Sequence, residues 1–224
     1  MADRQRTKVR RVPRRAVYER AAIEAILDEA PVCHLGTVDE EGLPVVIPTL
    51  HARIGEHVYF HGSAASRTLR EAERAEVCLA ATLLDGMVLA RSAFHHSVNY
   101  RSVVVFGRAE RIEAAAEKRR ALEAFTEKLM PGRWPDVRAP SEKELRATAV
   151  LRLGLAEASA KVREGGPVDE EADYELPVWA GTVPLRTVAC EAQPDERLAP
   201  GVEQPSYLER LAGGTFGQPG PRPA

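Results

Sequence analysis

Short apolar runs separated by tight turns are the feature of this sequence that most restricts its fold. Runs rich in Val, Ile, Leu and Ala occupy residues 32–38, 43–53, 57–61, 76–84, 87–93, 101–113 and 149–155. The connections at 39–42, 54–56 and 85–86 each contain glycine, and the Asp85-Gly86 pair is typical of a hairpin turn. Strands joined by such short connections run antiparallel. We therefore predict a mainly β, α+β chain in which an antiparallel barrel carries a few peripheral helices.

Helical spacing of apolar residues predicts three helices, at 18–30, 66–75 and 114–130. The first should end before Pro31, because a residue that precedes proline avoids the helical region. A chain of 224 residues without internal repeats can bury one sizeable core. We divide it into a basic arm at 1–15, one barrel domain at 16–190 and a C-terminal extension at 191–224. We expect its Gly- and Pro-rich end, at 213–224, to be disordered.

Pro44 and Pro48 interrupt the backbone donors of the 43–53 strand. A proline lacks the N–H group that pairs with a neighbouring strand, so this stretch should be unpaired on one side, bulged or turned toward a ligand. The neighbourhood of Pro48 is therefore a candidate ligand wall.

The distribution of charge argues against a nucleic-acid binder. The formal net charge is −2, although basic residues concentrate between Arg4 and Arg20. One interpretation of this arm is contact with nucleic acid or an acidic partner. The other, a mobile or surface-draped N-terminus, is favoured because no aromatic residues are interleaved for base stacking.

Cysteine usage and hydropathy point to a cytoplasmic protein without a membrane partner. Cys33, Cys78 and Cys190 are odd in number and widely separated, which predicts buried thiols in a reducing compartment. No apolar run approaches the roughly 18 residues of a membrane span. The N-terminus also lacks the apolar core of a signal peptide.

A turn with small hydroxyl residues follows the 57–61 strand, and it holds His61, Ser63, Ser66 and Arg67. Hydroxyl groups, a guanidinium and the free N–H groups of a helix start are the donors that a phosphate needs. The alternative is a Gly- and Ser-rich turn that only caps the next helix, and the residues alone leave both open.

Four segments together resemble the pyridoxamine 5′-phosphate oxidase-like family of FMN-binding split barrels. They are Val46-Ile-Pro-Thr49, His61-Gly-Ser-Ala-Ala-Ser-Arg67, Tyr100-Arg-Ser102 and Trp179-Ala-Gly181. The resemblance implies that the barrel is an antiparallel split β-barrel and that the second segment holds the FMN phosphate. It implies a cofactor-binding set of Val46, Ile47, Pro48, Thr49, His61, Ser63, Ser66, Arg67, Tyr100, Arg101, Ser102 and Trp179. It also implies a homodimer with the cofactor at the subunit interface, where Trp179 serves the partner's site.

Departures from the pyridoxamine phosphate oxidases concern the substrate. The lysine that ends their second strand falls near Leu50, the 131–138 segment lacks their substrate-binding Arg and Ser set, and no Arg-x-His follows Trp179. We therefore do not expect oxidation of pyridoxamine phosphate itself. Phe94-His-His-Ser-Val-Asn-Tyr-Arg-Ser102 instead resembles a motif of the nitroimidazole-resistance proteins.

His95 and His96 are the candidate catalytic residues. Adjacent side chains on an extended segment point in opposite directions and no third ligand stands at zinc spacing, so we expect no metal site. One of the two is a candidate proton donor near neutral pH. The alternatives are a histidine that only forms hydrogen bonds, or a haem ligand, since some split-barrel relatives bind haem.

These observations predict an FMN-binding oxidoreductase that passes electrons or hydride between the flavin and a small molecule. A second hypothesis is a protein that binds or stores flavin, deazaflavin or haem without turnover. A third is a regulatory module whose basic arm binds nucleic acid, which a steep loss of binding with salt would reveal.

Overall fold

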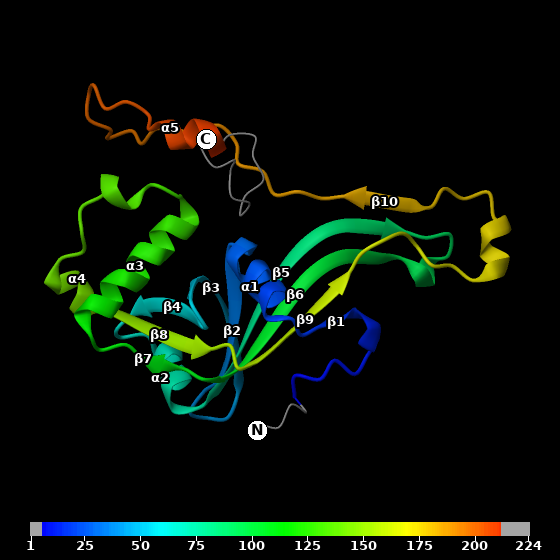
Figure 1. Cartoon of the computed structure of the whole chain (residues 1–224), viewed down its shortest axis with the longest axis horizontal. Helices are drawn as coiled ribbons and strands as arrows, with labels where there is room; N and C mark the ends of the chain where they lie inside the picture. The colour runs from blue at the N-terminus through cyan, green and yellow to red at the C-terminus, as the bar shows by residue number, and fades with distance from the viewer. Residues whose placement is uncertain (1–5, 212–224) are drawn as a thin grey trace.

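A computed structural model describes residues 6–211 of the chain (Figure 1). The strands are β1 (Ala16–Val17), β2 (Val32–Val38), β3 (Pro44–Ile54), β4 (His57–Ser63), β5 (Glu76–Leu89), β6 (Ser97–Arg108), β7 (Glu110–Arg111), β8 (Thr148–Gly154), β9 (Glu157–Arg163) and β10 (Gly181–Pro184). The helices are α1 (Arg20–Glu29), α2 (Arg67–Arg74), α3 (Ala115–Leu129), α4 (Glu142–Ala147) and α5 (Ser206–Leu211). Single 3-10 turns are η1 (Pro13–Arg15), η2 (Ala93–His95), η3 (Trp134–Asp136) and η4 (Glu171–Glu175).

All strand pairs are antiparallel and join into one 10-stranded sheet, in the order β1-β9-β6-β5-β2-β3-β4-β8-β7, with β10 added to β5. The sheet curves strongly without closing, and β5 and β6 run out of the barrel as a long arm (Figure 1). The α3 and α4 helices lie at the opposite end. The predicted α+β split barrel with peripheral helices is confirmed.

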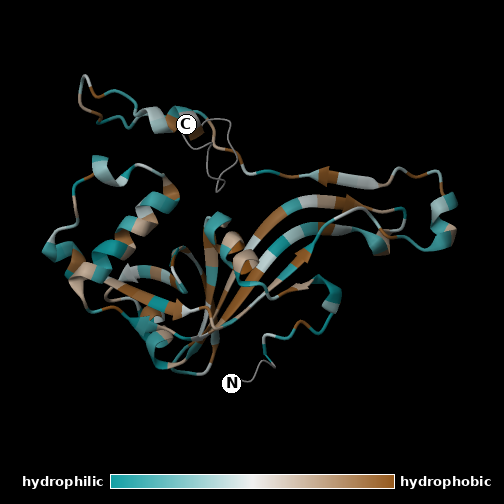
Figure 2. Ribbon diagram, in the orientation of Figure 1, coloured by the Kyte–Doolittle hydropathy of each residue, from teal (hydrophilic) through white to brown (hydrophobic). Residues whose placement is uncertain are grey.

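Two apolar clusters hold this sheet together. The larger lies within the curve of the sheet and packs Leu27 of α1 and Leu69 of α2 against Leu35, Phe60 and Val103. The smaller lies under α3, where Phe125 and Ala121 meet Tyr59 and Val150. Hydrophobic and hydrophilic residues alternate along the strands in Figure 2, as expected where one face is buried. The periodicity of the apolar runs therefore identified most of the core.

The prediction of a hairpin at Asp85-Gly86 is wrong. Residues on both sides belong to the single strand β5, and the pairing with β6 shifts register between Leu84 and Gly86. The segment is a β-bulge rather than a turn, and the Asp85 carbonyl accepts a hydrogen bond from Leu185 N at 3.0 Å. Glycine is needed here because a Cβ atom at Gly86 would lie 3.0 Å from the carbonyl oxygen of Val183 in β10.

We expect Gly86→Val to detach β10 from β5 while the barrel stays folded. The added side chain would force the β10 backbone away, at a cost of about 1–3 kcal/mol. Hydrogen exchange at the Leu185 amide, which Asp85 holds, should accelerate, whereas exchange in β2 should stay slow. Gly166→Val, at a position with open space around its Cβ, is the matched control.

Five strands and helices were not predicted, and one strand was misplaced. The β1, β9 and β10 strands and the α4 and α5 helices lay in segments that we assigned to no element, and β6 begins at Ser97 rather than at 101. The proline-containing strand behaves as one of the predicted alternatives. Among the described residues, β3 pairs with β2 from Pro44 to Leu50, and its pairs with β4 begin only at His51.

Both ends of the described chain lie against the body of the protein. Arg6 forms ion pairs with Glu76 and Glu157 and lies 5.2 Å from the centre of the Phe106 ring, in line with a surface-draped arm. At the other end, α5 docks on η3: Arg133 donates to Tyr207 Oη (2.8 Å), which donates to Asp136 (2.7 Å). The segment expected to be disordered, 213–224, lies outside the described residues.

The cysteines are only partly as predicted. All three are free thiols, and Cys33 is buried while Cys78 is half-buried. Cys190 is exposed, which contradicts the prediction, because it follows β10 at the last position of the predicted domain and belongs to neither apolar cluster of residues 6–211. None of the helices within residues 6–211 is long and apolar enough to cross a membrane.

Candidate functional site

The start of α2 presents the donors that a phosphate would use. Ser66 is the N-cap and its Oγ accepts from Leu69 N, while Ser63 Oγ accepts from Ala65 N at 3.2 Å. The Ser66 carbonyl accepts a hydrogen bond from the Arg70 amide. The N–H groups of Arg67 and Thr68, in the first turn, have no hydrogen-bond partner in the described part of the chain. These two amides and the dipole of α2 favour an anion.

Arg67 adds the positive charge of this cradle. Its side chain is 74% exposed, and its Nε lies 3.6 Å from Glu71 Oε1, a contact too long for a hydrogen bond. The guanidinium is therefore free to engage another anion. Neither carboxylate oxygen of the buried Glu71 has a hydrogen-bond partner within residues 6–211.

The β3 segment presents two of its four predicted residues outward. Val46 is 64% exposed and Pro48 is also exposed, whereas Ile47 packs against the core and Thr49 is half-buried. This alternation follows from the two-residue period of a strand. Val46 and Pro48 thus lie on one open face of the sheet, next to exposed residues of β2.

The Tyr100, Arg101 and Ser102 segment lies inside β6, between β5 and β9, rather than at a strand start. The Arg101 guanidinium is held by Glu29 of α1 (2.8 Å to Oε1) and by Asp85 (3.0 and 2.8 Å). These hydrogen bonds raise the pKa of Arg101 further above its ordinary value. Ser102 Oγ donates to the Lys161 carbonyl at 3.3 Å. Arg101 and Ser102 therefore already have partners within the chain.

His95, His96 and Trp179 lie far from α2 within one chain. The histidines follow β5 at the end of the long arm, and Trp179 precedes β10, on the opposite side of the molecule from α2 (Figure 1). His95 Nε2 is 3.6 Å from Glu170, and His96 Nδ1 is 2.9 Å from the Ser92 carbonyl. The Trp179 side chain is 67% exposed and folds back over Gly181. One chain alone does not bring the predicted residues together.

His61 faces α3 rather than the Arg67 cradle. Its ring centre is 4.3 Å from that of Phe125, and both residues line a pocket between β4 and α3. Desolvation lowers the pKa of His61, so its imidazole is neutral. The His61 ring thus contacts α3, whereas Ser66 and Arg67 belong to the start of α2.

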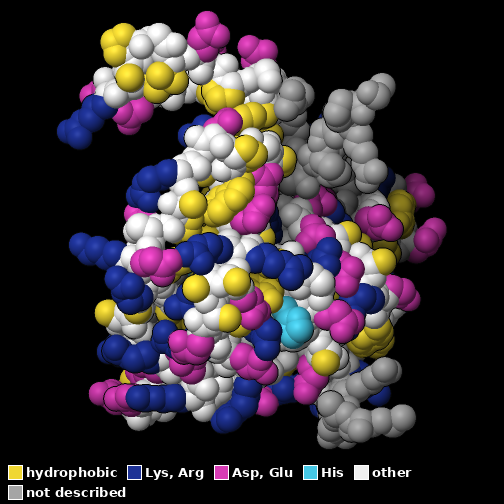
Figure 3. All heavy atoms as spheres, turned by 60° about the vertical axis from the view of Figure 1, so that its left-hand side comes forward, with side chains coloured by type: hydrophobic (Ala, Val, Ile, Leu, Met, Phe, Trp, Pro, Cys, Tyr) yellow, Lys and Arg dark blue, Asp and Glu magenta, His cyan; other side chains and the backbone are white. Residues whose placement is uncertain are grey.

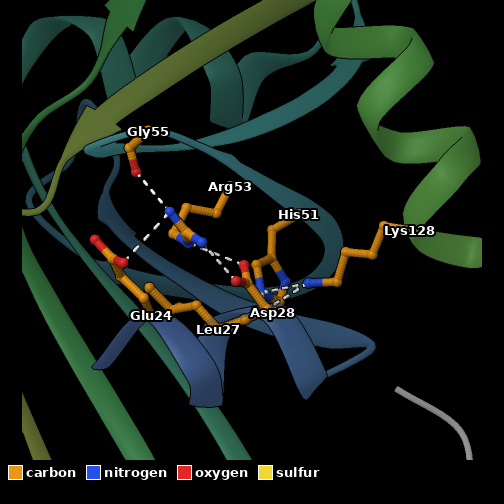
Figure 4. Close-up of polar contacts among 7 residues, drawn as sticks. All are labelled: Glu24, Leu27, Asp28, His51, Arg53, Gly55 and Lys128. Atoms are coloured by element: carbon orange, nitrogen blue, oxygen red, sulfur yellow. Dashed lines mark hydrogen bonds and ion pairs between the residues drawn. The ribbon is translucent and has the colours of Figure 1, made fainter. Parts of the chain in front are cut away.

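A buried basic cluster that sequence reasoning missed joins α1, β3 and α3 (Figure 4). Lys128 Nζ donates to the Leu27 carbonyl (2.7 Å) and lies 2.9 Å from His51 Nε2, which is itself 2.8 Å from the same carbonyl. Burial lowers the pKa of Lys128 to about 8, and burial together with the Lys128 charge lowers that of His51 to about 4. Beside them, Arg53 holds Asp28 through two hydrogen bonds of 2.9 and 2.6 Å. No motif marks this cluster, because its members are 77 residues apart.

The surface around α3, α4 and β8 does not carry the basic patch of a nucleic-acid interface. Lys and Arg side chains intermix with Asp and Glu over this face (Figure 3), and several pairs are direct. Examples are Arg152 with Glu110 and Glu117 (both 2.9 Å) and Arg111 with Glu73 (2.6 Å). Within residues 6–211 no group of three or more acidic, His or Cys side chains could hold a metal ion.

The flavocytochrome Anf3 from Azotobacter vinelandii is 43% identical over 94% of this chain and 98% of its own, with a TM-score of 0.88. An FAD and haem binding protein from Mycobacterium smegmatis is 35% identical over 89% of this chain and 98% of its own (TM-score 0.84). A candidate 5-nitroimidazole resistance protein from Bacteroides thetaiotaomicron is 25% identical over 66% of this chain and 86% of its own (TM-score 0.56).

No curated protein matches the sequence. The family model described as pyridoxamine 5′-phosphate oxidase matches residues 19–162, which is more than half of the chain and spans β2 to β9. The resemblance read from four short segments is thereby confirmed. With the split barrel and the solved relatives in agreement, this chain belongs to the pyridoxamine 5′-phosphate oxidase family of flavin-binding split barrels.

Proposed function

We propose that the protein is a flavin-dependent oxidoreductase that passes electrons or hydride between its flavin and a small molecule. The observation that carries this proposal is the 43% identity to a flavocytochrome over nearly the full length of both chains. FMN is the flavin that the family resemblance implies, and FAD, which the M. smegmatis relative binds, is the alternative. The free cysteines agree with the reducing cytoplasm that we propose as its location.

The chain's own residues fit the anionic end of a flavin nucleotide. The amides of Arg67 and Thr68 and the guanidinium of Arg67 are free to bind a phosphate, as shown above. A bound flavin would supply the redox chemistry, and the protein would bind it, orient it and exclude water. Val46 and Pro48 would offer an apolar wall, because both are exposed on β3.

We further propose a homodimer with the cofactor at the subunit interface. The outer face of the barrel leaves Val32, Val46 and Leu84 exposed, at 42%, 64% and 51%, which is unusual for a barrel face that water alone covers. Trp179 and the two candidate histidines lie on the far side of the same chain from α2. A partner in reverse orientation would bring them toward the cradle.

The purified protein, loaded with FMN or FAD and freed of excess ligand by gel filtration, tests the proposal. We expect it to elute as a dimer with one flavin per chain, which NADH or NADPH reduces and an added acceptor reoxidises. Mass spectrometry of the released flavin distinguishes FMN from FAD. Retained flavin that never turns over would instead support a binding or storage protein, and loss of all flavin would overturn the proposal.

We expect Arg67→Ala to weaken flavin binding by about 10–100-fold. The substitution removes one charge-assisted hydrogen bond to the phosphate, worth about 1.5–3 kcal/mol. Arg70→Ala is the matched control, since it removes an equal charge from an exposed position of the same helix. Flavin titrations followed by fluorescence quenching measure both. Equal affinity of the two variants would mean that the phosphate lies elsewhere.

A further inference from the structure

Arg163, the last residue of β9, is a buried cation without an acidic partner in the described part of the chain. The residue is 8% exposed, and its guanidinium donates to three neutral groups: the Asn99 side chain and the carbonyls of Gly165 (3.3 Å) and Gly166 (3.2 Å). Its Nε is buried and forms no hydrogen bond within residues 6–211. Glu164, the next residue, is exposed and forms no ion pair there. Buried charges are normally paired, so Arg163 lacks a counter-ion.

Two further cations lie beside Arg163. Lys161 precedes it by two residues on β9, so both side chains leave the same face of the strand, about 7 Å apart. Arg15 belongs to the basic arm and comes just before β1, which pairs with β9 at Lys161 (Figure 1). Burial and the Arg15 charge lower the pKa of Arg163 below its ordinary value. Neither Lys161 nor Arg15 forms an ion pair within residues 6–211, so three positive charges meet here without a negative one.

These cations lie on the outer face of the sheet. Val103 of β6 and its partner Ala160 of β9 belong to the larger core, so Tyr100 and Arg163, each three residues away, point outward. Tyr100 pairs directly with Arg163, and directly paired residues share a face. On its other side Tyr100 pairs with Leu84, which is 51% exposed. A line of aliphatic, aromatic and cationic side chains therefore crosses the face that includes Tyr100, a member of the predicted cofactor-binding set.

We propose that the small molecule which exchanges electrons with the flavin carries an oxyanion group, a phosphate or a carboxylate, and that Arg15, Lys161 and Arg163 bind this group. Guanidinium and ammonium groups are the donors that recognise phosphates and carboxylates in proteins. Leu84 and Tyr100 would contact the apolar part of the same molecule. The assignment rests on the proposed function for the identity of the molecule, whereas the anion site itself does not depend on it.

The turn that caps Arg163 can give way to such a group. Gly165 and Gly166 supply the capping carbonyls, and a Cβ atom at either position would have nothing within 4 Å. Gly165 also has a φ of 96°, which few other residues adopt. A turn without side chains in open space can shift with little loss of packing. Arg163 would then exchange neutral acceptors for a charged one, and hydrogen bonds between charged groups are the stronger.

Inorganic phosphate is the probe for this site, and calorimetric titration of the full-length protein at constant ionic strength measures its affinity. We expect Lys161→Met to bind phosphate about 10–100-fold more weakly than the wild type, because it loses one charge-assisted contact. Arg163→Met should lose as much. Arg120→Met is the matched control, since Arg120 is exposed on α3, at the other end of the fold (Figure 1).

Arg67→Ala separates this site from the cradle at α2, which also offers donors to phosphate. In an Arg67→Ala background, the phosphate binding that depends on Lys161 should persist. Lys161→Met keeps the test decisive if Arg163→Met does not fold, because the Lys161 ammonium forms no hydrogen bond or ion pair within residues 6–211. Equal phosphate affinity of Lys161→Met and Arg120→Met would overturn the anion site, and so would phosphate binding that Arg67→Ala alone abolishes.

The flavin-loaded protein tests whether the anion belongs to the substrate. Its flavin is reduced with dithionite and reoxidised with 1,4-naphthoquinone or with the 2-sulfonate of the same quinone, which carries an oxyanion. We expect Lys161→Met to raise KM for the sulfonate about 10–100-fold and to leave kcat and the KM for the neutral quinone unchanged.

Two results would overturn the assignment to the substrate. One is an equal effect of Lys161→Met on the two quinones. The other is a loss of FAD affinity in this variant without a loss of FMN affinity, because the second phosphate of FAD would then be the anion. A protein that retains no flavin would instead overturn the proposed function, and the phosphate titration would still decide the anion site.

Discussion

Acidification from pH 6.5 to pH 4 is expected to cost the wild-type fold about 3 kcal/mol more than it costs the His51→Leu variant. His51 is 1% exposed, and burial together with the Lys128 charge lowers its pKa from 6.5 to about 4. Between pH 6.5 and pH 4, His51 binds a proton in the unfolded chain but stays largely unprotonated in the folded chain. The free energy of unfolding therefore falls as pH falls. At 1.36 kcal/mol for each unit of pKa, the difference amounts to about 3 kcal/mol.

Urea unfolding at several pH values measures how steeply the free energy of unfolding falls with pH, which is the slope compared below. His34→Leu, at an exposed position of β2, is the control and should follow the wild type. Lys128→Met should flatten the slope in part, because the Lys128 charge is the second cause of the lowered pKa of His51. A wild type and a His51→Leu variant that lose stability in parallel would show that His51 is protonated within the fold.

Arg101→Met is expected to lower the free energy of unfolding by about 2–3 kcal/mol. The substitution leaves Glu29 and Asp85 facing each other without the guanidinium that holds both. Breaking a fully buried pair costs about 3–5 kcal/mol, and the side chains here keep 17–34% of their exposure, which reduces the effect. Thermal or urea unfolding measures the loss.

The same variant tests the role that the family resemblance implied for Arg101. Because its guanidinium already binds two carboxylates, we expect folded Arg101→Met to keep the wild-type flavin affinity. Arg101→Lys keeps the charge but not the planar fork, and should recover only part of the stability. A folded Arg101→Met protein that cannot hold flavin would show instead that Arg101 exchanges Glu29 or Asp85 for the cofactor.

Local patterns in the sequence predicted the strands but not what lies between distant segments. The 32–38, 43–53 and 57–61 runs became β2, β3 and β4 nearly unchanged, because alternation and turn residues are local. The Asp85-Gly86 pair led to a wrong prediction because glycine is suited both to a hairpin turn and to a close contact between strands. Only the position of Val183, far away in the sequence, shows that the close contact is the reason for glycine here. The α4 helix was readable, since Ser141 and Glu144 form a capping box.

The candidate site was predictable only where one segment holds it. Ser63, Ser66 and Arg67 lie within five residues, and their caps and free amides are properties of one turn. The pairing of His61 with Phe125 and that of His51 with Lys128 join β4 or β3 to α3, more than 60 residues apart. The roles predicted for Val46, Pro48, Tyr100 and Trp179 stay predictions, since they depend on a second chain or on the cofactor.

Pro44 and Pro48 also bear on how this protein avoids aggregation. The first half of β3 has a partner strand on one side only among the described residues, and the exposed edge of a sheet can template amyloid-like addition of another chain. Two residues without an N–H group cannot complete such a ladder. The apolar outer face can therefore meet a partner face to face, while the neighbouring edge resists growth into fibrils.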